Sequence, residues 1–173
     1  MILVSLLALT VAGLTNQVQA QAANEYQVKA AFILNFAKFV EWPSEAFDNG
    51  GVLVVGVIGD DPFDGGLDQI NGHTANGRRL RIKRLRWGDN LRVCHILFVS
   101  NSEGRRLGKI LESIRGANVL TIGEMPQFNQ SGGIIRFVIQ RNKVRFEINA
   151  NAAGETRLRI SSKLLALSKV GGN

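Results

Sequence analysis

The residues best placed to do chemistry follow the continuous apolar run at residues 52–58. Such a run is typical of a strand that is buried on both faces of a sheet. It ends in the segment Gly-Asp-Asp-Pro-Phe, in which glycine opens a tight turn and proline fixes the direction of the chain. In open α/β sheets, ligands bind outside the carboxyl ends of central strands. We therefore predict the rim of a small-ligand pocket at Gly59, Asp60, Asp61 and Phe63.

Few other side chains could support catalysis or hold a metal. The chain has two histidines and one cysteine. His73 lies alone in a loop rich in Asn and Gly, whereas Cys94 and His95 lie within an apolar run, which favours packed over catalytic roles. Neither a G-x-S-x-G nor a G-x-G-x-x-G motif is present. We predict no catalytic residue, no metal and no cofactor, and a hydrolase that uses Asp60 or His95 is the least favoured class.

We expect a sheet covered by helices to position the candidate residues at 59–63. Apolar runs at 52–58, 92–100 and 118–122 predict parallel strands, and they alternate with helical patterns at 63–71 and 102–115. An earlier helix is predicted over Glu25–Val40. Its aromatic stripe of Phe32, Phe36 and Phe39 either packs against the sheet or forms an exposed interface ridge.

The C-terminal part of the chain predicts a hairpin and a helix instead of further parallel strands. Residues 134–139 and 143–148 predict a hairpin that turns at Arg141–Asn142. Ser161 or Ser162 then caps a terminal helix whose Leu164, Leu165 and Leu167 point inward. We predict a single α/β domain with a mostly parallel or mixed sheet flanked by helices, a C-terminal antiparallel hairpin and a terminal helix.

The charge of the chain favours acidic partners. Lys and Arg number 21 against 14 Asp and Glu, a net charge of +7. Arg78–Arg86 alternates apolar and basic residues, so it predicts a strand with one basic face. That face either protects a sheet edge from pairing or docks an anionic partner, and the two roles are compatible. Interleaved aromatic residues are missing, so nucleic acid is not a predicted partner.

The first twenty residues predict a signal peptide. They are apolar to about Leu14 and end in Val18-Gln19-Ala20, with small residues where signal peptidase requires them. A membrane anchor is the alternative, but the run is shorter than the ~20 residues that span a bilayer. We predict export to the periplasm, cleavage after Ala20, and one soluble domain over residues 21–173 that does not span the membrane.

The order of several segments resembles the YfiR-like family of exported bacterial proteins. These segments are KAAFILNFAKFVEWP (29–43), GDDPF (59–63), NGRRLRIKRL (76–85), RVCHILFVSNS (92–102), VLTIGE (119–124), SGGIIRFVI (131–139), VRFEINANAA (144–153) and LRISSKLLAL (158–167). The positions that carry the resemblance most clearly are Lys29, Phe32, Asn35, Phe36, Trp42, Pro43, Gly133 and Asn149.

This resemblance implies a regulator rather than an enzyme. It implies that the protein binds and represses the periplasmic sensory part of an inner-membrane signalling protein, a diguanylate cyclase of cyclic-di-GMP signalling, and that it can form a homodimer. The alternative is a periplasmic small-ligand-binding module that feeds a sensor kinase. The family's redox-sensing member uses paired cysteines, whereas Cys94 alone cannot form an intramolecular disulfide. The partner-contact residues that we expect are Phe128, Ile134, Phe137, Glu147, Leu158 and Ile160.

Overall fold

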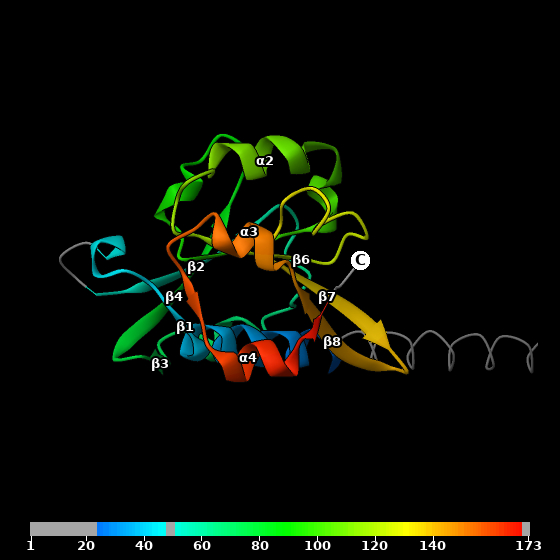
Figure 1. The fold of residues 1–173 in the computed structure, drawn as a ribbon, viewed down its shortest axis with the longest axis horizontal. Coiled ribbons are helices and arrows are strands. Elements are labelled where there is room, and N and C mark those ends of the chain that lie inside the picture. The colour runs from blue at the N-terminus through cyan, green and yellow to red at the C-terminus, as the bar shows by residue number, and fades with distance from the viewer. Residues whose placement is uncertain (1–23, 48–50, 171–173) are drawn as a thin grey trace, which may run out of the picture.

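A computed structural model of the chain describes residues 24–47 and 51–170. The predicted signal peptide, residues 1–20, lies outside the described residues. The main sheet has eight strands in the order β10-β8-β7-β6-β5-β2-β4-β3 (Figure 1). Its strands are β2 (Leu53–Ile58), β3 (Thr74–Ala75), β4 (Arg78–Leu85), β5 (Ile96–Val99), β6 (Leu120–Gly123), β7 (Ile135–Gln140), β8 (Lys143–Ile148) and β10 (Lys169–Val170). A second sheet pairs β1 (Val40–Glu41) with β9 (Arg159–Ile160).

The centre of the main sheet is parallel, as predicted. β2 pairs in parallel with both β4 and β5, and β6 pairs in parallel with β5 and β7. Five of the six β2 residues are buried, because helices or turns cover both faces of this strand. Gly56 allows the close approach of Cys94, whose Sγ lies 2.5 Å from where a Cβ would stand. The fold class is therefore a mixed α/β sheet flanked by helices, which confirms the prediction.

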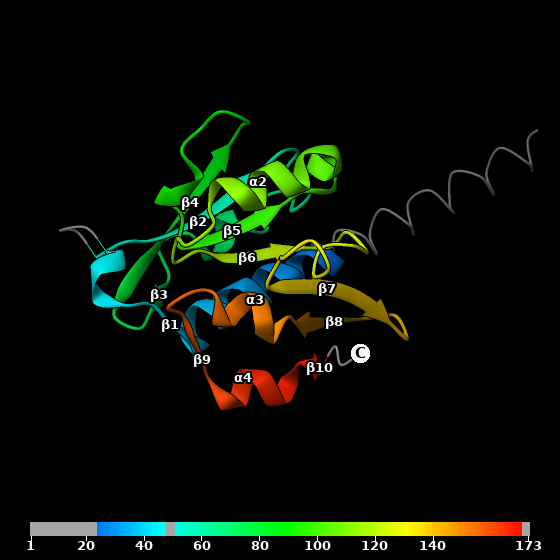
Figure 2. The same cartoon turned by 45° about the horizontal axis from the view of Figure 1, so that its top comes forward.

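Two hydrophobic clusters lie on opposite faces of the sheet. The N-terminal helix, residues 24–39 of the described chain, buries Ile33 and Phe36 in the larger cluster. The helix α2 (Leu107–Ser113) buries Leu107 and Ile110 in the smaller one. Figure 2 shows α2 on one side of the strands and the N-terminal helix on the other. The fold is thus a helix–sheet–helix sandwich, in which the parallel strands carry the core.

Aromatic packing joins the N-terminal helix to the hairpin of β7 and β8. The Phe36 ring lies 5.8 Å from Phe137 and 5.0 Å from Phe146, and Phe32 lies 5.5 Å from Phe146. Phe36 is fully buried, and Phe32 and Phe39 are half-buried against the same core. Of the two roles predicted for the aromatic stripe, packing against the sheet is confirmed.

One of the predicted helices is largely turns, and another begins as a 3-10 helix. The segment 63–71 contains only the 3-10 helix η2 (Asp68–Ile70), because Asp64 and Gly65 adopt left-handed φ angles of 46° and 79° that an α-helix cannot contain. In the segment 102–115, a 3-10 helix η4 (Asn101–Arg106) precedes α2. The Ser102 hydroxyl, near the start of this segment, accepts a hydrogen bond from the backbone N–H of Asp60.

The second predicted strand is also shorter than expected. Residues 91–93 form a 3-10 turn, η3 (Leu91–Val93), and the strand β5 starts only at Ile96. The side chain of Asn90 accepts a hydrogen bond from the backbone N–H of Arg92 at 3.0 Å and so starts this turn. An apolar sequence pattern cannot reveal such a local cap.

The C-terminal elements follow the prediction with one exception. β7 and β8 pair across Arg141 and Asn142, both with left-handed φ angles, as a tight hairpin turn requires. Ser161 caps the helix α4 (Ser162–Leu167) by accepting the N–H of Leu164. Leu164 is buried, but Leu165 and Leu167 are exposed, so the prediction that they point inward is wrong. A helix of six residues presents one narrow face to the core, which leaves its other leucines outside.

Two glycines hold the space for a buried aromatic ring. The side chain of Phe128 is fully buried in the loop between β6 and β7. A Cβ on Gly123 would lie 2.4 Å from this ring, and a Cβ on Gly133 would lie 2.2 Å from it. Gly123, the last residue of β6, and Gly133, shortly before β7, therefore enclose Phe128 from two sides, which is the physical reason for glycine at both positions.

We predict that Gly133→Ala destabilises the fold by about 2 kcal/mol, because the added methyl group overpacks the Phe128 ring. Urea unfolding followed by circular dichroism measures this loss. In the double variant with Phe128→Leu, the loss of stability should be smaller than the sum of the two single losses, because the smaller side chain leaves room for the methyl group. Strict additivity would contradict the enclosure of the ring by Gly133.

Candidate functional site

The predicted ligand residues lie at the carboxyl end of β2. Gly59 adopts a φ of 91° and lies directly against Ser100 and Ser102, which follow β5. The backbone N–H of Asp60 donates to the Ser102 hydroxyl at 2.9 Å. The carboxyl ends of two parallel strands therefore meet here, as the topology of an α/β sheet requires.

This end of the sheet is filled rather than hollow. Asp61 accepts hydrogen bonds from the backbone N–H of Phe63 at 2.9 Å and from Nε of Arg84 at 2.9 Å. Arg84 also binds both carboxylate oxygens of Asp68, which lowers the pKa of Asp68. Phe63 is buried between Tyr26 and Phe98, so it cannot form the rim of a ligand pocket, and this part of the prediction is wrong.

A buried charged cluster lies next to this edge. The side chain of Lys29 is 3% exposed and forms ion pairs with Glu25, one turn earlier, and with Glu124, directly after β6, at 3.1 Å. The Lys29 ammonium also lies over the Tyr26 ring at 4.3 Å. The cluster thereby fixes the first turns of the N-terminal helix to the end of β6.

Tyr26 completes this cluster. Its hydroxyl donates to Oε2 of Glu124 at 3.2 Å, and burial together with the Glu124 charge raises the pKa of Tyr26. Oε1 of Glu124 is buried without a hydrogen bond, and its nearest cation is Lys29. The composition of one cation and two carboxylates is suited to holding a helix in place, and its burial leaves no room for a substrate.

A groove opens beside the charged cluster, between the N-terminal helix and the β7–β8 hairpin. It has a volume of about 340 Å³. Its apolar side chains include Val28 and Ile139, which are 39% and 51% exposed, and the half-buried Phe32. Glu25 lies at the helix side of the groove, and Lys143 and Arg145 lie at the hairpin side. We call this feature the helix–hairpin groove.

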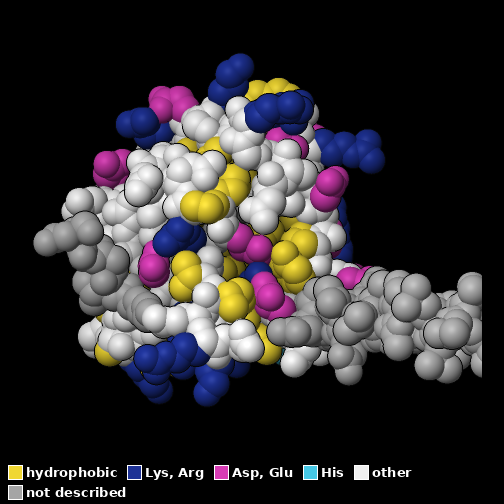
Figure 3. Space-filling model, turned by 90° about the vertical axis from the view of Figure 1, so that its right-hand side faces the viewer, with side chains coloured by type: hydrophobic (Ala, Val, Ile, Leu, Met, Phe, Trp, Pro, Cys, Tyr) yellow, Lys and Arg dark blue, Asp and Glu magenta, His cyan; other side chains and the backbone are white. Residues whose placement is uncertain are grey.

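The face with the carboxyl ends of β6 and β7 is mixed in character. Figure 3 shows acidic, basic and apolar side chains interspersed around its centre. In the groove, the exposed apolar side chains of Val28 and Ile139 thus lie near Glu25, Lys143 and Arg145.

The residues predicted to contact a partner are mostly in the core. Phe128, Ile134 and Phe137 are 0%, 3% and 2% exposed, so the prediction that they form a contact surface is wrong. Along β7 the alternation of side chains points Phe137 toward the N-terminal helix, whereas Ile139 lies past the region that the helix covers. Phe128, Ile134 and Phe137 are therefore core residues, whereas Ile139 on the same hairpin is exposed.

The other three predicted contact residues are buried or half-buried. Glu147 is half-buried and binds Arg136 at 2.8 Å. Leu158 is 8% exposed, so the prediction that it contacts a partner is also wrong, and Ile160 is half-buried in β9. The contact role predicted for Glu147 and Ile160 stays a prediction.

The residues behind the family resemblance serve the fold. At the amino end of β5, Trp42 donates from Nε1 to the carbonyl oxygen of His95 at 3.2 Å. The His95 ring stacks on Phe47 at 4.4 Å, accepts the N–H of Val54 at Nδ1 and lies 2.9 Å from the Ala46 carbonyl oxygen through Nε2. This pattern places the proton on Nε2 and holds His95 as a packed residue, as predicted.

Three further positions of the family resemblance lie at helix starts or on the surface. Asn149 caps α3 (Ala150–Gly154) by accepting the N–H of Ala152, and it also donates to the Asn129 carbonyl oxygen. Pro43 precedes the 3-10 helix η1 (Ser44–Ala46), and Asn35 is exposed on the N-terminal helix.

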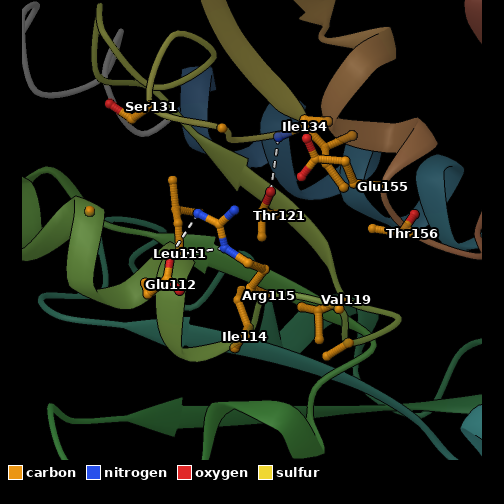
Figure 4. Close-up of a pocket in the computed structure, with 15 residues that line it drawn as sticks. Leu111, Glu112, Ile114, Arg115, Val119, Thr121, Ser131, Ile134, Glu155 and Thr156 are labelled. Carbon is orange, nitrogen blue, oxygen red and sulfur yellow. Dashed lines mark hydrogen bonds and ion pairs between the residues drawn. The ribbon is translucent and has the colours of Figure 1, made fainter.

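A small cavity lies between α2, β6 and α3. It has a volume of about 100 Å³, which is below the range of ordinary small-ligand sites. Thr121 is buried on its wall and accepts the backbone N–H of Ile134, while Arg115 binds Glu112 at its mouth (Figure 4). The cavity fits a few water molecules or a small ion.

Neither a metal site nor a membrane-spanning helix occurs in the described part of the chain. Within residues 24–47 and 51–170, no three His, Cys, Asp or Glu side chains gather in a way that could hold a metal ion. No helix in these ranges is long and apolar enough to cross a bilayer.

Comparison with known proteins gives one clear match. A family model described as YfiR/HmsC-like matches residues 26–169, which is most of the chain. No curated protein matches. The matched range contains all the main-sheet strands except the last residue of β10, together with the charged cluster apart from Glu25 and most of the helix–hairpin groove.

Sequence reasoning missed the role of Lys29 in this site. The signal was present, because Lys29 lies on the apolar side of its helix, one turn before Ile33 and two before Phe36. A lysine on such a face requires a buried carboxylate. Its partner Glu124 could not be named, because ninety-odd residues separate the two positions.

We predict that Lys29→Met destabilises the protein by about 3 kcal/mol, because it leaves Glu25 and Glu124 close together without a cation. Lys38→Met, an exposed lysine on the same helix, is the matched control and should have little effect. Chemical unfolding of both variants tests this. Equal losses in the two variants would contradict the role of the buried cluster.

Cys94 should resist thiol reagents in the folded protein. Burial raises its pKa to about 12, so its thiolate fraction at pH 8 is on the order of 10⁻⁴. We predict slow labelling by a chromogenic disulfide in buffer and rapid labelling in urea. Labelling at the same rate in both solvents would show that the thiol is not buried.

Proposed function

Because the chain belongs to the YfiR/HmsC-like family, we propose that it binds and represses the periplasmic sensory part of an inner-membrane diguanylate cyclase. Membership of this family supports a periplasmic regulator of cyclic-di-GMP signalling in general. The identity of the partner and the repression are the parts that we add. The match over residues 26–169 is the observation that carries the proposal.

The proposed mechanism is a shift in the conformations of the partner. A regulator that binds one state of a sensory domain more tightly than another populates that state. The protein needs no chemistry of its own for this, and we propose that it acts without catalysis. Its packed histidine and buried cysteine are consistent with a binding role.

We assign the contact to the helix–hairpin groove. Val28 and Ile139 would meet an apolar segment of the sensory domain, and burial of such side chains supplies most of the affinity at protein interfaces. Lys143 and Arg145 would meet acidic residues that flank this segment. The groove is held open by the aromatic packing of Phe32 and Phe36 beneath it.

The alternative, a ligand-binding module that feeds a sensor kinase, has less support. The residues that we predicted for its pocket include the buried Phe63 and the hydrogen-bonded Asp61. The volume of the cavity beside Thr121 is about 100 Å³. We therefore retain the protein partner as the proposed function.

We predict that Ile139→Asp abolishes capture of the membrane partner, because a charge in the groove cannot be buried against an apolar segment. The tagged, exported protein is used to recover partners from solubilised membranes, and cellular cyclic-di-GMP is measured in parallel. Leu167→Asp, at an exposed leucine of α4, is the control and should behave as wild type.

The outcomes distinguish an error in the proposed function from an error in the proposed contact surface. If the wild type recovers no membrane protein and its deletion leaves cyclic-di-GMP unchanged, the proposed function is wrong. If Ile139→Asp still captures the partner, the function stands and the contact lies outside the groove. Thermal unfolding of each variant confirms that it is folded.

A further inference from the structure

Strand β4 presents a row of exposed cations. Arg79, Arg81 and Lys83 alternate along the strand, are exposed, and point away from the face that buries Leu80. Alternate residues of a strand lie about 6.6–6.8 Å apart, so the three charges form a regular line. β4 has β2 on one side and only the two-residue β3 on the other, so the line follows an edge of the sheet.

Residues 24–47 and 51–170 supply no counter-charge to these cations. Among the described residues, neither Arg79, Arg81 nor Lys83 forms an ion pair with a carboxylate. Arg84, on the opposite face of the same strand, shows the contrast, because it binds both Asp61 and Asp68. The line of three is therefore available to an external anion.

An exposed tryptophan follows the line. Trp87 is 48% exposed in the turn after β4, and Val93 is 39% exposed a few residues later. Gly88, at a φ of 100°, and the hydrogen bond from the Arg86 N–H to Asp89 shape this turn. Figure 2 shows the turn projecting beyond the strands. We call Arg79, Arg81, Lys83 and Trp87 the basic strand patch.

The shape of the basic strand patch favours a lipid surface over a partner that fits into a groove. The helix–hairpin groove and the small cavity beside Thr121 lie elsewhere in the fold, and the Trp87 turn projects outward instead of forming a groove. Long flexible cations beside an exposed tryptophan are typical of the membrane–water interface, where the indole ring rests at the headgroup level. The net charge of +7 adds attraction to anionic headgroups.

We propose that the basic strand patch binds anionic phospholipid headgroups, with Trp87 inserted at the level of the headgroups. This peripheral binding goes beyond the proposed repression and does not depend on it. It concentrates the protein at a membrane surface and leaves the helix–hairpin groove free, because the groove is lined by other elements.

Co-sedimentation with lipid vesicles tests the proposal. The protein is expressed as the full chain, purified in its exported form and mixed with phosphatidylcholine vesicles with or without phosphatidylglycerol. At low salt of about 50 mM we expect binding only to the anionic vesicles, and loss of this binding as salt screens the charges. The variant Arg79→Gln/Arg81→Gln/Lys83→Gln should bind at least about tenfold more weakly.

Two further variants make the test specific. Lys38→Gln/Arg105→Gln/Lys109→Gln removes three exposed cations elsewhere and should reduce binding far less. Anionic vesicles should shift the tryptophan fluorescence of the wild type to shorter wavelength, and Trp87→Phe should remove this shift while Trp42 remains. Equal weakening by the two triple variants would overturn the proposal. So would failure to bind anionic vesicles combined with patch-dependent binding of polyglutamate, which would indicate an acidic protein partner.

Discussion

The packing of the N-terminal helix on the β7–β8 hairpin is the interaction on which the other features depend. Phe36 lies between Phe137 and Phe146, and all three rings are almost completely buried. Lys29, on the same face, points inward because its charge is paired with the carboxylate of Glu124 at the end of β6. Apolar burial thus provides the stability, and the ion pairs fix the position of the helix along the sheet. The groove is the region where the hairpin extends past this contact.

Much of the fold could be predicted because its signals are local and periodic. The continuous apolar run of β2, the alternation in β4 and the turn at Arg141–Asn142 each identify an element without tertiary information. The failures occurred where local chemistry interrupts a pattern. Asp64 and Gly65 adopt left-handed conformations inside a helical pattern, and the Ser102 hydroxyl accepts the backbone N–H of Asp60 from a distant segment. Such choices are decided by contacts between segments, which periodicity does not report.

The candidate site was harder to predict than the fold. Alternation along β7 separates inward from outward residues, but it does not say how far the covering helix extends, so it does not distinguish the buried Phe137 from the exposed Ile139. The glycines at positions 123 and 133 could be recognised as unusual, yet their role depends on Phe128 lying between them. A contact surface is defined by what the core leaves uncovered. It can therefore be located only after the packing of the core is known.

The topology keeps the two proposed surfaces apart. The groove is formed at β7 and β8, the basic strand patch follows β4, and β6, β5 and β2 lie between them. Occupation of one surface therefore leaves the other accessible, and no rearrangement of the core is needed. If a membrane holds the patch, the groove meets its partner from a restricted set of orientations, which reduces the rotational freedom lost on binding. Two weak contacts on one rigid sheet can in this way act as one stronger attachment.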